Sequence, residues 1–239
     1  MFRHKGKTRT YQHNLRLAAL LSFIAGLVNV CGVLSVKVLT TNVTGHFAFF
    51  SEEISNKQYT QALIFLLYIF SFLVGSFISN VLIEIVAKIN PRVSHAAPML
   101  IEIVVLMVIG FFGQKFANGQ LIACLLLFIM GMQNSLVTQV SQATVRTTHL
   151  TGLFTDLGIE LSQLFFYKEM EQQYKLRKSI YLRLTIIFCF FIGCVLGGFA
   201  YKVFVFKTLL IAATILVIAV FYDNILYSFY FFKRKLRDQ

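Results

Sequence analysis

The chain has 239 residues, of which 57% are hydrophobic and only 13% are charged, and its formal net charge is +12. Soluble domains carry about 25% charged residues, because polar side chains must cover their surface. The composition therefore excludes a water-soluble globule, a disordered chain and a disulfide scaffold. It predicts an all-α, polytopic transmembrane helical bundle.

Six apolar segments approach or exceed the length of about 20 residues that a bilayer-spanning helix needs. In chain order they cover residues 17–36, 61–86, 99–112, 121–140, 181–200 and 203–222. The third segment is short unless it extends over 96–116. The first follows a basic N-terminus that resembles a signal peptide but has no small-residue cleavage site, so we treat it as a retained helix.

The basic residues predict the orientation of these spans. With the N-terminus inside, 17 Lys and Arg residues fall in cytoplasmic segments and four fall on the opposite side. Lys and Arg accumulate in cytoplasmic loops, so both termini are expected in the cytoplasm. The same distribution disfavours nucleic-acid binding, because a nucleic-acid binder collects its basic residues on one face of a folded domain.

Two motifs occur twice in the chain. The pattern F-I-x-G-x-x-N covers residues 23–29 and 128–134, and T-T-x-[VL]-T-G-x-F covers residues 40–47 and 147–154. The repeat units, 17–116 and 117–232, lie between a basic N-terminus (1–16) and a basic tail (233–239). Each unit holds three predicted spans, and because three is odd, the second unit must enter the membrane from the opposite side.

Inverted repeats of this kind are typical of transporters, whose solute pathway lies between the two halves. The alternative is an old duplication that serves only as a packing scaffold. Consecutive Thr residues followed by Gly weaken a helix and expose backbone groups that bind a solute or ion. Helix-like runs follow each T-G, at 47–54 and 153–166, so both motifs are expected at helix N-termini, which favour anions.

The polar residues in and near the motifs form the candidate substrate-binding site, because polar groups inside a membrane are tolerated where they line a cavity or pack on protein. For each of them, capping and packing is the alternative role. Asp156, which shares a helix face with Glu160, either binds a cation or stabilises a helix N-terminus. The candidates are Asn29, Thr41, Thr44, Gly45, His46, Gln133, Asn134, Thr148, His149, Thr151, Gly152 and Asp156.

The second motif carries a family resemblance. Residues 131–135 (GMQNS), 146–152 (RTTHLTG) and 155–158 (TDLG) resemble the signature of the YoaK-like family of bacterial membrane proteins. Two positions depart from the family pattern, which commonly has Asp in place of Asn29 and Asn in place of His46. The resemblance implies a bacterial cytoplasmic (inner) membrane location and six or seven helices, and it adds little about the substrate.

Ionisable residues within spans are functional candidates, because a charge in hydrocarbon costs several kcal/mol. Glu84 and Glu102 lie near the cytoplasmic ends of two spans, where pairing with Arg92 or Arg146 would close a gate; snorkelling to the interface is the alternative. Residues 153–179 are predicted to form an amphipathic cytoplasmic segment whose basic end meets anionic lipid.

The leading hypothesis is a transporter or channel for a small solute or ion, with its site between the repeats at the two T-G motifs. A non-catalytic membrane assembly or signalling protein is the main alternative, and a membrane-embedded enzyme is less favoured because the catalytic motifs H-E-x-x-H and G-x-S-x-G are absent from the sequence. The cysteine and histidine spacings predict no metal or cofactor. The sequence is compatible with both a monomer and a homo-oligomer.

Overall fold

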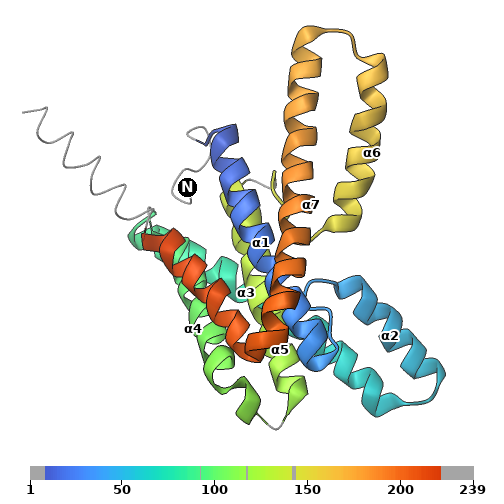
Figure 1. Ribbon diagram of the computed structural model, residues 1–239, viewed down its shortest axis with the longest axis vertical. Helices are drawn as coiled ribbons and strands as arrows, with labels where there is room; N and C mark the ends of the chain where they lie inside the picture. Colours follow the sequence, from blue (N-terminus) through green and yellow to red (C-terminus); the bar gives the residue numbers. More distant parts are fainter. Residues whose placement is uncertain (1–8, 92, 117, 142–143, 222–239) are drawn as a thin grey trace, which may run out of the picture.

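The computed structural model describes residues 9–91, 93–116, 118–141 and 144–221 (Figure 1). The predicted all-α class is confirmed over these residues. The α-helices with both bounds in these residues are α1 (Tyr11–Val36), α2 (Val43–Ser55), α3 (Tyr59–Ile89), α4 (Ala96–Phe112), α5 (Gly119–Ser141), α6 (Leu150–Phe166) and α7 (Met170–Phe204). Short 3-10 turns, η2 (Gly113–Lys115) and η3 (Val205–Lys207), follow α4 and α7, and residues 208–221 are again helical.

Within the described residues, five helical stretches are long and apolar enough to cross a membrane. They are Tyr11–Val36, Tyr59–Ile89, Ala96–Lys115, Gly119–Ser141 and Met170–Phe221. In hydrocarbon a helix satisfies all of its backbone polar groups within one segment, which is why apolar runs of this length become helices. The third stretch reaches 20 residues because α4 begins at Ala96 and the turn η2 extends it to Lys115.

The last stretch, Met170–Phe221, contains 52 residues, more than twice the length of about 20 residues that one crossing needs. It contains the predicted segments 181–200 and 203–222 and is interrupted between them by η3. Val205 has a φ of 49°, which a β-branched residue adopts only where the chain must turn. In Figure 1 the helix after this turn runs back beside α4.

Close helix packing pairs α1 with α7 and α3 with α5. A Cβ atom on Gly26 of α1 would lie 2.1 Å from the Phe190 carbonyl oxygen, and one on Gly193 of α7 would lie 2.1 Å from that of Phe23. Only a residue without a side chain allows the backbones to approach this closely.

The α3–α5 pair makes the corresponding contacts. A Cβ on Gly75 would lie 2.0 Å from the Phe128 carbonyl oxygen, and one on Gly131 would lie 2.1 Å from that of Phe72. The residue after each α7 or α3 glycine donates a hydrogen bond across the contact: Cys194 Sγ to the Gly26 carbonyl at 3.2 Å, and Ser76 Oγ to the Gly131 carbonyl at 3.0 Å. The repeated positions therefore make matching contacts.

The core lies around α1 and α5, in which 61% of the most apolar window is buried, against 22% in α3. The exposed face of α3 carries large apolar side chains, such as Leu63, Phe70 and Phe77, each more than half exposed. An apolar face of this size is unsuited to water and suits contact with lipid.

The two shorter helices form hairpins with the long helices that follow them, α2 with α3 and α6 with α7. Leu157 of α6 packs on Leu176 and Ile180 of α7. The predicted amphipathic segment 153–179 thus takes in most of α6, a turn and the first ten residues of α7, and the apolar face of α6 rests on protein at this contact. The basic tail 233–239 and residues 1–8 of the basic N-terminus lie outside the described residues.

Candidate functional site

The two repeated asparagines each hold the loop that leads into a short helix. Asn29 Oδ1, on α1, accepts hydrogen bonds from the Thr40 backbone N–H at 3.0 Å and from the hydroxyls of Thr40 and Thr41 at 3.4 and 3.1 Å. In α5, Asn134 Oδ1 accepts bonds from the hydroxyls of Thr147 and Thr148 at 3.4 and 2.8 Å. Both loops turn back on the preceding helix and bring a T-G motif close to it.

Each T-G motif lies in the first turn of a short helix, as predicted from the sequence. Asn42 caps α2 by accepting a hydrogen bond from the Gly45 N–H at 3.0 Å, as is common for an Asn side chain at an N-terminus. His149 is the residue before α6, and its ring occupies the space where a Gly152 Cβ would point, 2.3 Å away. The glycine of each motif therefore leaves room for the side chain that precedes the helix.

A cavity of about 910 Å³ lies between these two helix N-termini. Its lining comes from both repeats and is rich in hydroxyl and amide groups. It includes eight of the predicted substrate-binding residues: Asn29, Thr41, Thr44, Gly45, Asn134, Thr148, His149 and Thr151. In Figure 1, α2 and α6 extend from this region in different directions.

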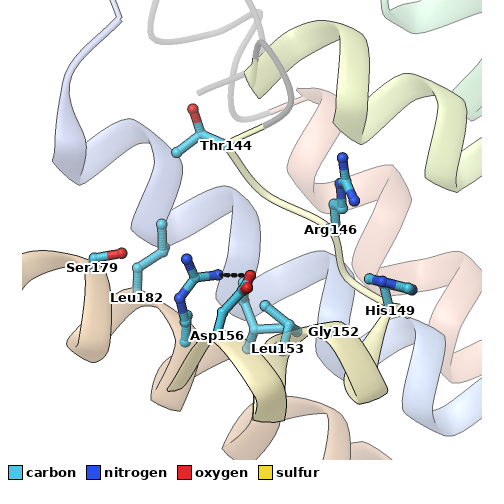
Figure 2. Close-up of a pocket in the computed structure, with 10 residues that line it drawn as sticks. Thr144, Arg146, His149, Gly152, Leu153, Asp156, Ser179 and Leu182 are labelled. Carbon is cyan, nitrogen blue, oxygen red and sulfur yellow. Dashed lines mark ion pairs between the residues drawn. The ribbon is translucent and has the colours of Figure 1, made fainter. Parts of the chain in front are cut away.

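A second cavity, of about 410 Å³, adjoins the first, and Arg146 and His149 line both. Figure 2 shows these two residues on the loop that leads into α6. The predicted residues Gly152 and Asp156 line only this smaller cavity.

An ion cluster between α6 and α7 forms one wall of the smaller cavity. Arg183 pairs with Asp156 (Nη1–Oδ2 2.9 Å; Figure 2) and makes two parallel bonds to Glu160, at 2.8 and 2.9 Å. Ser179 Oγ donates a further bond to Glu160 Oε1 at 2.6 Å. A bidentate Arg–carboxylate pair is among the stronger polar contacts in proteins, so Glu160 is the main partner of Arg183. Asp156 adds a single ion pair to the same guanidinium.

His46 and Gln133 lie away from both cavities. His46 is buried, 2% exposed, with Nε2 bonded to the Leu39 carbonyl at 2.9 Å and its ring against Phe65 and Tyr68. Burial lowers the pKa of His46 below its usual value, which favours the neutral ring. Gln133 is buried as well and donates from Nε2 to the Leu21 carbonyl at 2.9 Å.

The predicted gate residues are dispersed. Glu84 is exposed on α3, Glu102 is buried in α4 at 1% exposure, and Arg146 is exposed in the loop before α6. None of the ion pairs that the structure describes joins Glu84, Glu102 or Arg146. Arg92 lies outside the described residues, so its pairing stays a prediction.

Arg183 is the main residue of this region that the sequence hypothesis omitted. It lies two residues inside the predicted segment 181–200, and an arginine within an apolar span is itself a signal of a buried partner. Phe72 and Phe190 also line the larger cavity, and each begins a pattern, F-x-x-G-x-x-x-[SG], that occurs at residues 72–79 and 190–197. Thr138 lines the cavity as well, and nothing in its local sequence distinguishes it from other helix residues.

The apolar helices and their number define an integral, multi-pass membrane protein. Residues 17–222 match the family described as "Protein of unknown function (DUF1275)", and the chain belongs to this family. It is similar to the UPF0700 transmembrane protein YoaK of Bacillus subtilis (strain 168), with 24% identity over 187 residues, which is 77% of this chain and 82% of that protein. The YoaK-like resemblance is thereby confirmed. No solved structure matches the chain significantly.

Proposed function

We propose that the protein is a transporter or channel for a small solute or ion, with its binding site in the larger cavity. The main support for this proposal is that one cavity of about 910 Å³ is lined by both T-G motifs and both motif asparagines. Polar groups and helix ends are tolerated within a membrane protein where they line a cavity. A packing scaffold has no need of such a space.

The two halves act in this proposal as inverted repeats. Support comes from matched contacts: Asn29 and Asn134 bind equivalent threonines, and Gly26 and Gly131 meet equivalent carbonyls. If the 52-residue stretch Met170–Phe221 crosses twice, turning at η3, the chain has six crossings and three in each half. The odd number inverts the second half relative to the first.

The location and orientation belong to the same proposal. A bacterial relative and the excess of basic residues in the predicted inner segments support the cytoplasmic membrane with both termini inside. The gate formed by Glu84, Glu102, Arg92 and Arg146 stays a hypothesis. We assign the chain no catalytic role, because the acids nearest the cavities, Asp156 and Glu160, are occupied by Arg183.

Water access to the two motifs tests the proposal. The four native cysteines are replaced, with Cys194→Ser chosen because Ser76 makes the corresponding bond to a glycine carbonyl. Single cysteines at Thr44 or Thr151 are then labelled with a membrane-impermeant thiol reagent in intact cells and in inverted vesicles. We expect labelling of at least one site from both sides, because a transport pathway must open to both aqueous phases.

Two reference positions calibrate the labelling. A cysteine at Ile24, which is fully buried, sets the signal of a dry contact, and one at Lys57, which is exposed, sets the signal of open water. If folded protein with a cysteine at Thr44 or Thr151 labels no better than the Ile24 variant, the motifs are dry helix contacts. The alternative, a non-catalytic membrane assembly protein, would then replace the transport proposal.

A further inference from the structure

We infer that the larger cavity binds an anionic group, held by Arg146 and by the side-chain amides of Asn29 and Asn134. This inference rests on the proposed function and names the chemical class of its solute. The anionic group belongs either to a free solute, such as a small carboxylate, or to a lipid phosphate. Both sources present the same chemistry to the cavity.

The charge inventory of the cavity favours an anion. Among its lining residues Arg146 alone carries a permanent charge, and no ion pair within the described residues neutralises it. Arg183, in the adjoining cavity, differs from Arg146 because Asp156 and Glu160 already neutralise its guanidinium. An unpaired guanidinium in a partly enclosed space attracts carboxylates and phosphates.

The asparagine amides supply hydrogen-bond donors to the same space. Asn29 Oδ1 accepts from the Thr40 backbone N–H, a group that can only donate, so the oxygen end of this amide is determined. The acceptor is thus occupied, and the amide N–H₂ has no protein partner within the described residues. Asn134 repeats the arrangement with its two threonine hydroxyls. In both amides the acceptor is used internally and the donor is left over, which suits an anion.

The two short helices add to this preference. Val43 and Leu150, the first residues of α2 and α6, both line the cavity. The first backbone N–H groups of a helix have no partner within the helix, and the helix dipole places partial positive charge there. In α2 the Gly45 N–H is already bonded to Asn42 Oδ1, so the donors that remain come before Gly45. The cavity therefore favours an anion, through Arg146, the two amides and both helix ends. A bare cation would find none of its usual carboxylate ligands in the lining.

Fluorescence quenching tests the inference, because the chain contains no tryptophan. Phe72, which lines the cavity and is half-buried, is changed to Trp, so that Phe72→Trp places a single reporter in the purified, detergent-solubilised protein. Iodide, caesium and acrylamide serve as anionic, cationic and neutral quenchers. We expect the quenching constant for iodide to exceed that for caesium by ~3-fold or more, because a cationic cleft concentrates anions.

Variants assign this preference to named groups. Arg146→Gln removes the charge, and Asn29→Asp keeps the acceptor for Thr40 while adding a negative charge; both should bring the iodide constant down to that of caesium. Arg177→Gln is the matched control, since Arg177 is exposed on α7 and lines neither cavity. If Phe72→Trp does not fold, as judged by helical circular dichroism, Leu150→Trp places the reporter at another residue of the lining.

The outcomes of this experiment distinguish failure of the anion site from failure of the proposed function on which it rests. If acrylamide does not quench the reporter, the cavity is dry, and the proposed function fails together with the anion site. If acrylamide quenches but iodide and caesium act equally, or Arg146→Gln changes nothing, the anion site is overturned while a solute pathway stands. Competition then identifies the source: acetate suppresses iodide quenching if the group is a free solute, and phosphatidylglycerol suppresses it if the group is a lipid phosphate.

Discussion

Asn29 stabilises its loop as an acceptor, and this determines which substitutions it tolerates. Asn29→Ala would leave the Thr40 N–H and the Thr41 hydroxyl without their partner, at a cost of about 1–3 kcal/mol. Asn29→Asp keeps the acceptor, so we expect a smaller loss of stability. Thermal unfolding in detergent, followed by circular dichroism, measures both variants. An Asn29→Ala protein as stable as the parent would show that other contacts hold the loop.

At the scale of the helices, backbone contact at glycine joins each repeat to the other. Gly75→Ala places a methyl group 2.0 Å from the Phe128 carbonyl oxygen, so α3 and α5 must separate, with a loss of about 1–3 kcal/mol or more. Gly158→Ala on α6 is the matched control, because a Cβ there meets nothing within 4 Å and alanine favours a helix by about 1 kcal/mol. Denaturant melts should therefore move in opposite directions. Equal destabilisation by the two variants would contradict the packing described above.

For the whole molecule, the crossed pairing makes each half dependent on the other. The partner of α1 is α7 and the partner of α3 is α5, so both close contacts join residues of 1–116 to residues of 117–239. We expect either half expressed alone to be degraded, and the two expressed together to co-purify as a helical complex. Affinity purification of a tagged 1–116 half, with and without the 117–239 half, measures this. A stable, monomeric 1–116 fragment would contradict it.

Much of the candidate site followed from the repeated motifs. The motif asparagines and the T-G residues were predicted to act together, and the structure brings eight predicted residues to one cavity. His46 and Gln133 occupy variable positions within the motifs but face other helices, because a shift of one residue along a helix turns the side chain to another face. Motif spacing alone does not include that rotation.

Arg183 shows a second reason why the sequence did not predict the whole site. Its sequence position marks it as an ionisable residue in an apolar segment, yet its partners Asp156 and Glu160 come from another helix. Their meeting requires α6 to fold back on α7, which the four-residue spacing of the two acids permits but does not dictate. Ion-pair partners on different helices depend on the topology of the fold, so the local sequence pattern does not predict them.

Composition and hydropathy by themselves determined that this is an all-α membrane protein with long apolar helices, since burial in lipid leaves the backbone few other options. The repeated motifs determined which polar residues to consider. Only the tertiary structure decided that α1 pairs with α7 and α3 with α5, and that the two T-G motifs border one cavity. The reason is physical: close packing depends on how the surfaces of distant segments fit in three dimensions, and those distances are not recorded in the order of residues along the chain.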